Sequence, residues 1–387
     1  MNGGFRLREE RVCGHRGAHW TLSFVALALS VVLTSTSSFG EEFTGSKNRQ
    51  IFYQGKRLQA IDIHFHAADS FDQLGATGQK FIKENLPNFL PDFLKDFSLR
   101  ATTGMIYNPF GLFGIQRECI GVGLTYCGLF ATYAPNSWGT IDNDYIFSKL
   151  SSPKNKKVKE GGRLLFGLAS IDVLNWVENE KKNLTVLEEA LQKPGFKGIK
   201  LAFIHNEVPL DETAYDSIYD VARKYQVPVY HHVGSSPLRT LDDFDSDEEK
   251  KNYLKSYDPT LLSRAVKKYP DVKFIFGHMG FDFNKEGYDF SESVLQMVSE
   301  NENIYLEISA FGREQFDPGS KFMDYALAKL KKMGVLSRVI YGSDGPLFPG
   351  ATKQYLETTM RSMVRVGYTY EEAVAVLYGN SKRIFKL

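Results

Sequence analysis

The feature that most constrains the fold is a regular alternation of short apolar segments with segments of helical spacing, from residue 163 to the C-terminus. The apolar segments, which we predict to be strands, are residues 163–171, 196–203, 227–232, 272–278, 304–309 and 339–343. The segments with helical spacing are residues 184–192, 214–225, 259–269, 291–300, 323–333, 352–366 and 370–377. Strands that alternate with helices in this way are typical of βα units and of a parallel sheet.

Two further strands are expected before this region, one at residues 58–63 and one within residues 120–131. Eight strands predict an α/β fold of the closed (β/α)8 type, a TIM barrel, over residues 56–387. An open, doubly wound sheet is the competing architecture. Because such a barrel needs only about 250 residues, we expect an insertion after the first strand, at residues 67–116, that forms a lid over one mouth of the barrel.

The first 40 residues have a different composition from the rest of the chain. Four arginines come first, an apolar segment at residues 22–33 follows, and small and polar residues fill 34–40. This layout predicts a secretory signal peptide at residues 1–40, and therefore an exported protein, periplasmic or extracellular. The apolar segment is shorter than the about 20 residues of a membrane span, so we expect no stable membrane span after cleavage. An uncleaved amphipathic anchor is the alternative.

Net charge and cysteine content limit the possible partners and the possible disulfide bonds. A formal net charge of +1 over 387 residues argues against a partner such as nucleic acid. Export would place Cys119 and Cys127 in an oxidising compartment. If one extended strand joins them, they lie about 26 Å apart and cannot bond, so we favour two separate thiols. A turn at Gly121 or Gly123 would instead bring them together.

Histidines gather at the predicted strand ends. His64 and His66 are two residues apart, so both project to the same face of one strand. The six histidines at or just past a strand end are His64, His66, His205, His231, His232 and His278. Asp344 ends the last strand and Lys200 lies within the fourth. Because a barrel site is built at the carboxyl ends of the strands, these residues predict a hydrolytic metal site, with zinc its commonest occupant.

Each of these residues also has an alternative structural interpretation. A single histidine at a strand end is usually a structural residue with a hydrogen-bonded partner. Asp344 lies in a Ser-Asp-Gly-Pro sequence that suits a turn. His205 lies beyond its strand and is expected to be a loop residue rather than a ligand. Only one of His231 and His232 can face the barrel interior, and their spacing does not choose between them.

Six short motifs, in order along residues 55–387, resemble a known family. They are Ile61-Asp62-Ile63-His64-Phe65-His66, Phe196-Lys197-Gly198-Ile199-Lys200-Leu201, Val227-Pro228-Val229-Tyr230-His231-His232, Gly277-His278-Met279-Gly280, Tyr341-Gly342-Ser343-Asp344 and Leu377-Tyr378-Gly379-Asn380. The chain resembles the amidohydrolase superfamily, in the amidohydrolase-related branch that includes aminocarboxymuconate-semialdehyde decarboxylase and the γ-resorcylate decarboxylases. The opening His-x-His is moderately specific alone, whereas the ordered set is highly specific.

The resemblance implies a set of site residues. The implied metal ligands are His64, His66, His232 and Asp344, with His278 as a catalytic histidine. His232 stands four residues after Pro228 and two before Gly234, as the family pattern requires, so His231 would point outward. Members with two metals use a carboxylated lysine on the fourth strand, which would be Lys200. This branch generally works with one divalent ion, zinc or manganese, and its members are often homodimers.

Two reactions share this scaffold. In hydrolysis, a metal-activated water attacks a carbonyl of an ester, lactone or amide, and Asp344 takes its proton. In nonoxidative decarboxylation, the same ion binds a small carboxylic acid, and an acid protonates the carbon that is released. Export favours a metal-dependent hydrolase of a small molecule, with His278 as an acid or electrophile. Arg239, after the fifth strand, is a weak candidate for binding a substrate carboxylate. An exported, catalytically silent binding protein is a further alternative.

Overall fold

The computed structural model describes residues 43–70, 73–84, 111–135, 137–157, 162–210, 213–346 and 350–387. The predicted signal peptide and residues 85–110 of the predicted lid lie outside this described part, so both remain predictions. Within it, residues Phe43–Leu387 form one compact unit.

Eight parallel strands form one sheet, in the same order in space as along the chain. They are β4 (Ile61–His66), β5 (Tyr126–Phe130), β8 (Leu165–Ala169), β9 (Phe196–Leu201), β10 (Val229–His232), β11 (Phe274–Gly277), β12 (Ile304–Ile308) and β13 (Val339–Tyr341). The first and last strands meet where Phe65 pairs with Gly345 in parallel. There the His66 N–H donates to the Gly345 carbonyl at 2.8 Å, and the Gly345 N–H donates to the His64 carbonyl at 3.2 Å. The predicted (β/α)8 barrel is confirmed.

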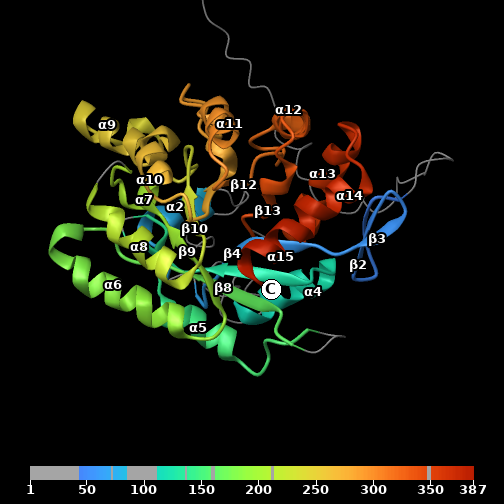
Figure 1. The fold of residues 1–387 in the computed structure, drawn as a ribbon, viewed down its shortest axis with the longest axis horizontal. Coiled ribbons are helices and arrows are strands. Elements are labelled where there is room, and N and C mark those ends of the chain that lie inside the picture. Colours follow the sequence, from blue (N-terminus) through green and yellow to red (C-terminus); the bar gives the residue numbers. More distant parts are fainter. Residues whose placement is uncertain are drawn as a thin grey trace, which may run out of the picture. The chain divides into compact units, whose positions relative to one another are not determined.

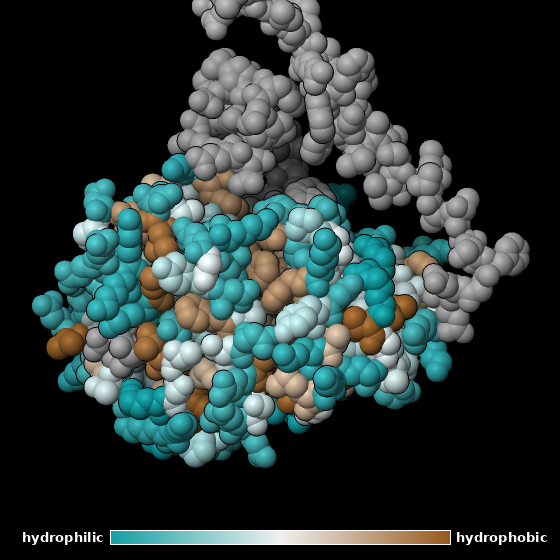
Figure 2. All heavy atoms as spheres, turned by 90° about the horizontal axis from the view of Figure 1, so that it is seen from above, coloured by the Kyte–Doolittle hydropathy of each residue, from teal (hydrophilic) through white to brown (hydrophobic). Residues whose placement is uncertain are grey.

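Helices surround the strands (Figure 1). They include α5 (Asn143–Ser151), α6 (Trp176–Gln192), α8 (Asp216–Tyr225), α10 (Ser263–Lys268), α11 (Ser291–Glu300), α12 (Lys321–Lys332), α13 (Ala351–Arg365), α14 (Tyr370–Val374) and α15 (Asn380–Phe385). Polar residues cover most of the face seen in Figure 2, and its apolar patches are small and separate. No helix of the described part is long and apolar enough to cross a membrane.

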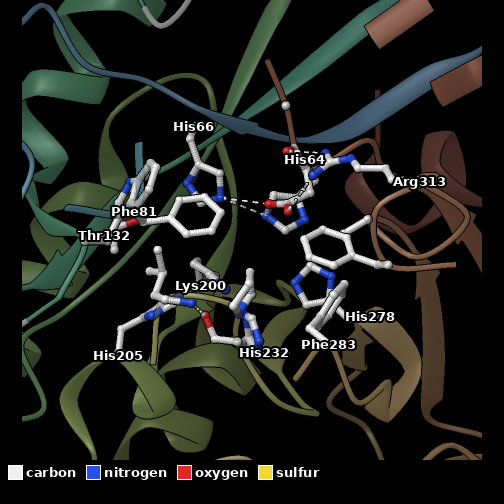
Figure 3. Close-up of a pocket in the computed structure, with 18 residues that line it drawn as sticks. His64, His66, Phe81, Thr132, Lys200, His205, His232, His278, Phe283 and Arg313 are labelled. Atoms are coloured by element: carbon white, nitrogen blue, oxygen red, sulfur yellow. Dashed lines mark hydrogen bonds and ion pairs between the residues drawn. The ribbon is translucent and has the colours of Figure 1, made fainter. Parts of the chain in front are cut away.

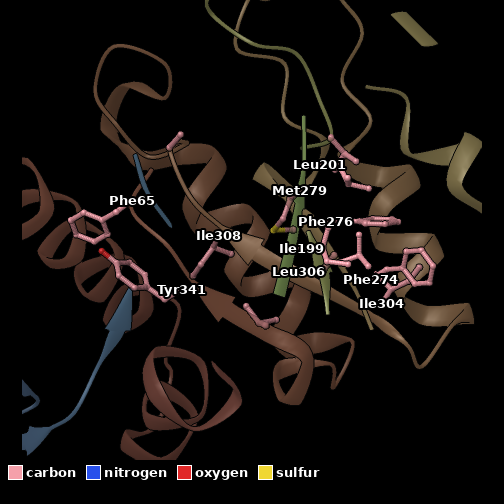
Figure 4. Close-up of a cluster of buried hydrophobic side chains, with 14 of the residues drawn as sticks. Phe65, Ile199, Leu201, Phe274, Phe276, Met279, Ile304, Leu306, Ile308 and Tyr341 are labelled. Atoms are coloured by element: carbon pink, nitrogen blue, oxygen red, sulfur yellow. The ribbon is translucent and has the colours of Figure 1, made fainter. Parts of the chain in front are cut away.

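The strands separate two apolar layers because successive side chains of a strand point to opposite faces. Phe274 and Phe276 of β11 belong to the layer between strands and helices (Figure 4), whereas Ile275 belongs to the cluster inside the barrel. Phe385 of α15 packs on Phe166 inside that cluster, with ring centroids 5.2 Å apart. Because the C-terminal helix contributes to the interior cluster, the barrel core is packed with side chains rather than open.

The region before the second strand differs from our expectation. Residues Leu112–Val122 form helix α4, and the strand begins only at Tyr126. Gly123, at φ +93°, ends the helix where an added Cβ would lie 2.4 Å from the Arg49 carbonyl oxygen. This reversal brings Cys119 of α4 within 6.6 Å of Cys127 of β5, Cα to Cα, and the two form a disulfide. The expectation of two separate thiols was wrong, because it assumed one extended segment between them.

Candidate metal centre and active site

A pocket opens at the carboxyl ends of the strands (Figure 3). It is lined by His64, His66, Phe81, Thr132, Trp138, Lys200, His205, His232, Ser236, Pro237, Leu238, His278, Phe283, Ala310, Arg313, Phe316, Asp344 and Gly345. Phe81 comes from α2 (Ala76–Glu84), the described start of the predicted lid. Polar groups from the strand ends therefore face aromatic walls contributed by the loops.

Three side chains converge at one point of this pocket. The Nε2 atoms of His64 and His66 lie 3.2 Å apart. Oδ1 of Asp344 lies 3.2 Å from the first of these nitrogens and 3.1 Å from the second. Three ligands at about 2.1 Å from one ion in a tetrahedral arrangement would lie about 3.4 Å from one another. The triangle of donor atoms therefore has nearly the size that a metal site requires, and these three residues form the metal-type cluster of the described part.

The hydrogen bonds of His64 support the same conclusion. Its Nδ1 lies 3.1 Å from Oε1 of the buried Glu307, a distance that suits a proton on Nδ1 donated to the carboxylate. Burial also holds the pKa of His64 well below its usual range, so its Nε2 presents a lone pair. That lone pair faces a carboxylate oxygen of Asp344. Among the described residues, only a proton on His66 Nε2 lies within hydrogen-bond distance of both acceptors. A cation would satisfy all three atoms at once.

Asp344 follows β13 with φ +56°, a conformation that L-residues rarely adopt. Arg313 secures it, because its Nη2 donates to the carbonyl oxygens of Ser343 and Asp344 at 2.6 and 2.8 Å. Burial disfavours the Asp344 carboxylate, but the hydrogen bond from His66 and the charge of Arg313 oppose burial, and the pKa of Asp344 lies well below the usual range. Asp344 is therefore ionised and rigidly held at neutral pH.

A second buried carboxylate ties the first strand to the last. Oδ1 of Asp62 accepts from the backbone N–H groups of His64 at 3.1 Å and Ser343 at 2.9 Å. Burial raises the pKa of Asp62 to about 7. Asp62 thereby holds the segments that carry His64 and Asp344 in register across the closing gap of the barrel.

His278 stands beside this centre, directly after β11. Its ring centroid lies 5.4 Å from that of His64, and its Nδ1 lies 2.8 Å from the Ser309 hydroxyl. His278 and Met279 both adopt positive φ, at +61° and +53°. Burial lowers the pKa of His278 to about 4, so its ring is neutral at neutral pH.

The neighbouring histidines of β10 point to opposite sides. His232 lines the pocket, and its Nε2 lies 3.2 Å from the Ser235 carbonyl oxygen. His231 faces the helices, where it stacks on Phe203 and Phe274. Thus His232 lies on the pocket side, as the resemblance implied, but its donor atoms are outside the triangle formed by His64, His66 and Asp344. Its role as a ligand remains a prediction.

We expected His205 to lie in a loop, but the structure places it in a helix. It belongs to the short helix α7 (Phe203–Asn206) and lines the pocket. Its ring meets that of His232 edge to face, with centroids 5.3 Å apart. The helix immediately after β9 turns this residue back over the strand ends, which spacing along the sequence does not reveal.

Lys200 of β9 also faces the pocket and is 1% exposed. Its Nζ lies 4.3 Å from the centroid of the Tyr230 ring, and it has no hydrogen-bond or ion-pair partner within the described part of the chain. Burial lowers the pKa of Lys200 to about 7. The carboxylated form that would bridge two metals remains a prediction.

Arg239 does not lie where it could bind a substrate carboxylate in the pocket. It forms an ion pair with Glu207 and is not among the residues that line the pocket. Arg313 occupies the position that we had sought for a pocket arginine. It lies in the loop after β12, and nothing in its sequence context distinguishes it from an exposed arginine.

Glu307 and Tyr230 were not predicted as site residues. The one available signal was a charged residue in the apolar segment Ile304-Tyr305-Leu306-Glu307-Ile308, because an ionisable group inside a barrel strand needs partners. Tyr230 lay within a motif that we had quoted only for its histidines. Its hydroxyl lies 3.2 Å from both Glu307 Oε2 and His64 Nδ1.

Solved structures with the same fold include an uncharacterised TIM-barrel protein from Bordetella bronchiseptica, at 14% identity and TM-score 0.56, over 85% of this chain and 99% of the other. Another is a probable 2-pyrone-4,6-dicarboxylic acid hydrolase from Acinetobacter baumannii, at 16% identity and TM-score 0.53, over 85% and 100%. A third is a 5-carboxyvanillate decarboxylase from Novosphingobium aromaticivorans complexed with manganese, at 16% identity and TM-score 0.53, over 90% and 100%. These likenesses show the fold alone.

A comparison with curated proteins finds no match. The amidohydrolase family model matches residues 168–387, which is more than half of the chain. The matched region contains His232, His278 and Asp344, and the structure adds His64 and His66 from the first strand to the same pocket. The chain belongs to the amidohydrolase family, whose members are metal-dependent enzymes that act on small molecules.

Proposed function

We propose that this protein is a metal-dependent hydrolase that adds water to the carbonyl group of a small ester, lactone or amide. The observation that carries the proposal is the ionised Asp344 carboxylate, held against the Nε2 atoms of His64 and His66 at 3.1–3.2 Å. A divalent ion in this triangle would lower the pKa of a water molecule and polarise a carbonyl oxygen. Zinc is the first candidate for this ion and manganese the second.

The residues around the triangle suit the proton transfers of hydrolysis. Asp344 is a proton acceptor at neutral pH, because its pKa lies well below the usual range. Arg313 holds the backbone of Asp344 through two hydrogen bonds, so the carboxylate stays in place when its charge changes. Phe283 and Phe316 line the same pocket and exclude water from the reacting groups.

Decarboxylation of a small carboxylic acid is the second candidate, and Lys200 favours it. A buried ammonium group without a hydrogen-bond partner in the described part of the chain would gain stability from a bound carboxylate. Its pKa of about 7 would also let Lys200 return a proton to carbon. Hydrolysis remains our first proposal because Asp344 has the charge and position of a general base.

We also propose that the mature protein is exported. The predicted signal peptide suggests this, and the Cys119–Cys127 disulfide supports it because disulfides persist in oxidising compartments. Sequencing the N-terminus of exported material would test the proposal, since an intact Met1 there would refute cleavage near Gly40.

The function is tested with the full chain loaded separately with zinc and with manganese. A panel of lactones, esters and amides is assayed for acid release, and a panel of aromatic and unsaturated carboxylic acids for carbon dioxide release. We expect acid release that incorporates oxygen-18 from labelled water. Carbon dioxide release without acid release from the first panel would favour the decarboxylase, and stoichiometric metal without turnover would favour a silent binding protein.

A further inference from the structure

We propose that Glu307 sets the proton positions of two pocket histidines, directly on His64 and through the Ser309 hydroxyl on His278. Each ring then carries its proton on Nδ1 and presents an unprotonated Nε2. Glu307 and Ser309 are positioning residues in this assignment, because they act on groups that face the pocket.

The barrel is built to hold this carboxylate. Glu307 is 0% exposed and lies on β12 between two glycine positions of the adjacent segments. A Cβ at Gly342 would lie 2.0 Å from Glu307 Oε1, and a Cβ at Gly277 would lie 1.8 Å from the Tyr230 hydroxyl oxygen. Glu307 and Tyr230 are both fully buried, so neither side chain can move aside to avoid the clash. The two glycines therefore leave the space that the Glu307–Tyr230 pair occupies.

The first oxygen of this carboxylate determines the state of His64. Oε1 lies 3.1 Å from His64 Nδ1, and the Tyr230 hydroxyl oxygen lies 3.2 Å from the same nitrogen. The tyrosine proton is directed to Oε2 of Glu307, also at 3.2 Å. Both oxygens therefore act as acceptors toward His64 Nδ1, and this nitrogen holds the proton.

The second oxygen determines the state of His278. Oε2 lies 3.3 Å from the backbone nitrogen of His278, which can only donate, and 2.5 Å from the Ser309 hydroxyl. Because a serine has one hydroxyl proton, donating it to Glu307 leaves only lone pairs toward His278. The 2.8 Å contact between Ser309 Oγ and His278 Nδ1 then requires the proton on Nδ1.

The consequence is that His278 Nε2 is a hydrogen-bond acceptor. This reverses our expectation of His278 as an acid or electrophile, since a neutral ring in this tautomer has no proton to give from Nε2. The proton positions hold whichever reaction the protein performs. Only the use of His278 as a proton acceptor rests on the proposed hydrolysis.

The test is nitrogen-15 NMR of the histidine rings in the full chain, recorded with zinc loaded and after its removal. Ring nitrogens with and without a proton have well-separated shifts, and a His278→Gln variant assigns the His278 signals. We expect His278 to be protonated on Nδ1 in both samples. A proton on Nε2 of His278 in the unaltered protein would overturn the proposal.

Two variants separate the direct effect of Glu307 on His64 from its effect on His278 through Ser309. Ser309→Ala removes the hydroxyl acceptor at 2.8 Å and leaves His278 Nδ1 only the Ser309 carbonyl oxygen at 3.5 Å. We therefore expect a mixture of His278 tautomers with His64 unchanged, while Ser309→Thr keeps the original pattern. In Glu307→Gln, the fixed donors at Oε2 hold the amide oxygen there and place the NH2 group against His64 Nδ1. We therefore expect about 10–100-fold weaker zinc retention in Glu307→Gln. Unchanged tautomers and zinc retention in both variants would contradict the assignment.

Activity gives a third measurement once a substrate is known. We expect Ser309→Ala to lower kcat by about 10-fold with little change in KM. The matched control is Ser381→Ala, another fully buried serine, whose hydroxyl has no partner within the described part. An equal loss in both variants would mark Ser309 as a packing residue only. Correct proton positions without turnover of any carbonyl substrate would contradict the proposed hydrolysis and leave this assignment supported.

Discussion

Histidines on the inner and outer sides of the barrel strands have opposite surroundings. On the inner side, His64 and His232 line the pocket, and His64 is hydrogen-bonded to the buried Glu307. On the outer side, His231 stacks between Phe203 and Phe274, and one of its ring nitrogens has no partner in the described part. The inner histidines are arranged for chemistry, whereas the outer one is arranged for packing. The comparison shows that the direction in which a side chain points, rather than its type, decides its role.

The largest expected effect is on the inner side. Asp344→Asn removes a charge and an acceptor while it keeps the shape of the side chain, so turnover should fall by about 10²–10⁴-fold. Steady-state kinetics measure the loss, and circular dichroism checks that the fold is retained. Asp216→Asn, which alters a carboxylate that pairs with Arg264 on the outside of the barrel, is the control and should keep its rate. A full rate in Asp344→Asn would remove Asp344 from the mechanism.

The next prediction tests the two sides directly. His231→Ala leaves a cavity among aromatic rings, so we expect a loss of about 2–4 kcal/mol in the free energy of unfolding, with metal retention unchanged. His232→Ala should instead weaken metal retention and cost less stability. Urea unfolding and metal analysis of the two variants measure both quantities. The reverse pattern would show that the inner and outer sides are exchanged.

The disulfide sharpens the comparison, because Cys119 and Cys127 both belong to the outer layer. It closes a loop with a sequence separation of 8, for which chain entropy predicts a stabilisation of about 2.5 kcal/mol. Reductant should lower the stability of the natural protein by this amount and leave a Cys119→Ala/Cys127→Ala variant unaffected. Unfolding curves that do not respond to reductant would contradict the bond.

Over a single pH unit, the smallest effect is a pH dependence of stability from the outer side. Burial lowers the pKa of His231 to about 3, so the folded protein excludes the charged ring while the unfolded chain takes up a proton below about pH 6.5. Stability is therefore fully present above about pH 6.5 and falls, as the pH drops toward about 3, by at most about 1.4 kcal/mol per unit. His231→Phe should reduce this slope. An unchanged slope would assign the acid sensitivity to other groups.

Local sequence patterns predicted most of the barrel. Helix α11 has the predicted bounds, and the strands after residue 163 all lie within the predicted segments. The second strand lies within the predicted residues 120–131, but the segment before it is a helix, because Leu112–Val122 has an apolar pattern that suits either a strand or a helix. The first strand was predicted three residues too early, because residues 56–58 form a separate short strand, β3 (Lys56–Leu58).

The candidate site was predicted less completely. His64, His66, His278 and Asp344 could be selected because each follows a predicted strand, and the carboxyl ends of barrel strands meet at one face. Glu307 could not be selected in this way, since its role depends on contacts with His64 and Ser309 from other strands. Arg313 depends in the same manner on the path of the loop after β12.

The sequence was sufficient to predict the alternation of strands and helices and the positions of the histidines at the strand ends. Both depend only on the spacing of residues along one segment. Tertiary structure alone decided the Cys119–Cys127 bond and the contacts of Glu307. These features depend on distances between segments far apart in the chain. Such distances are set when the barrel closes and its layers pack, and no local pattern encodes them.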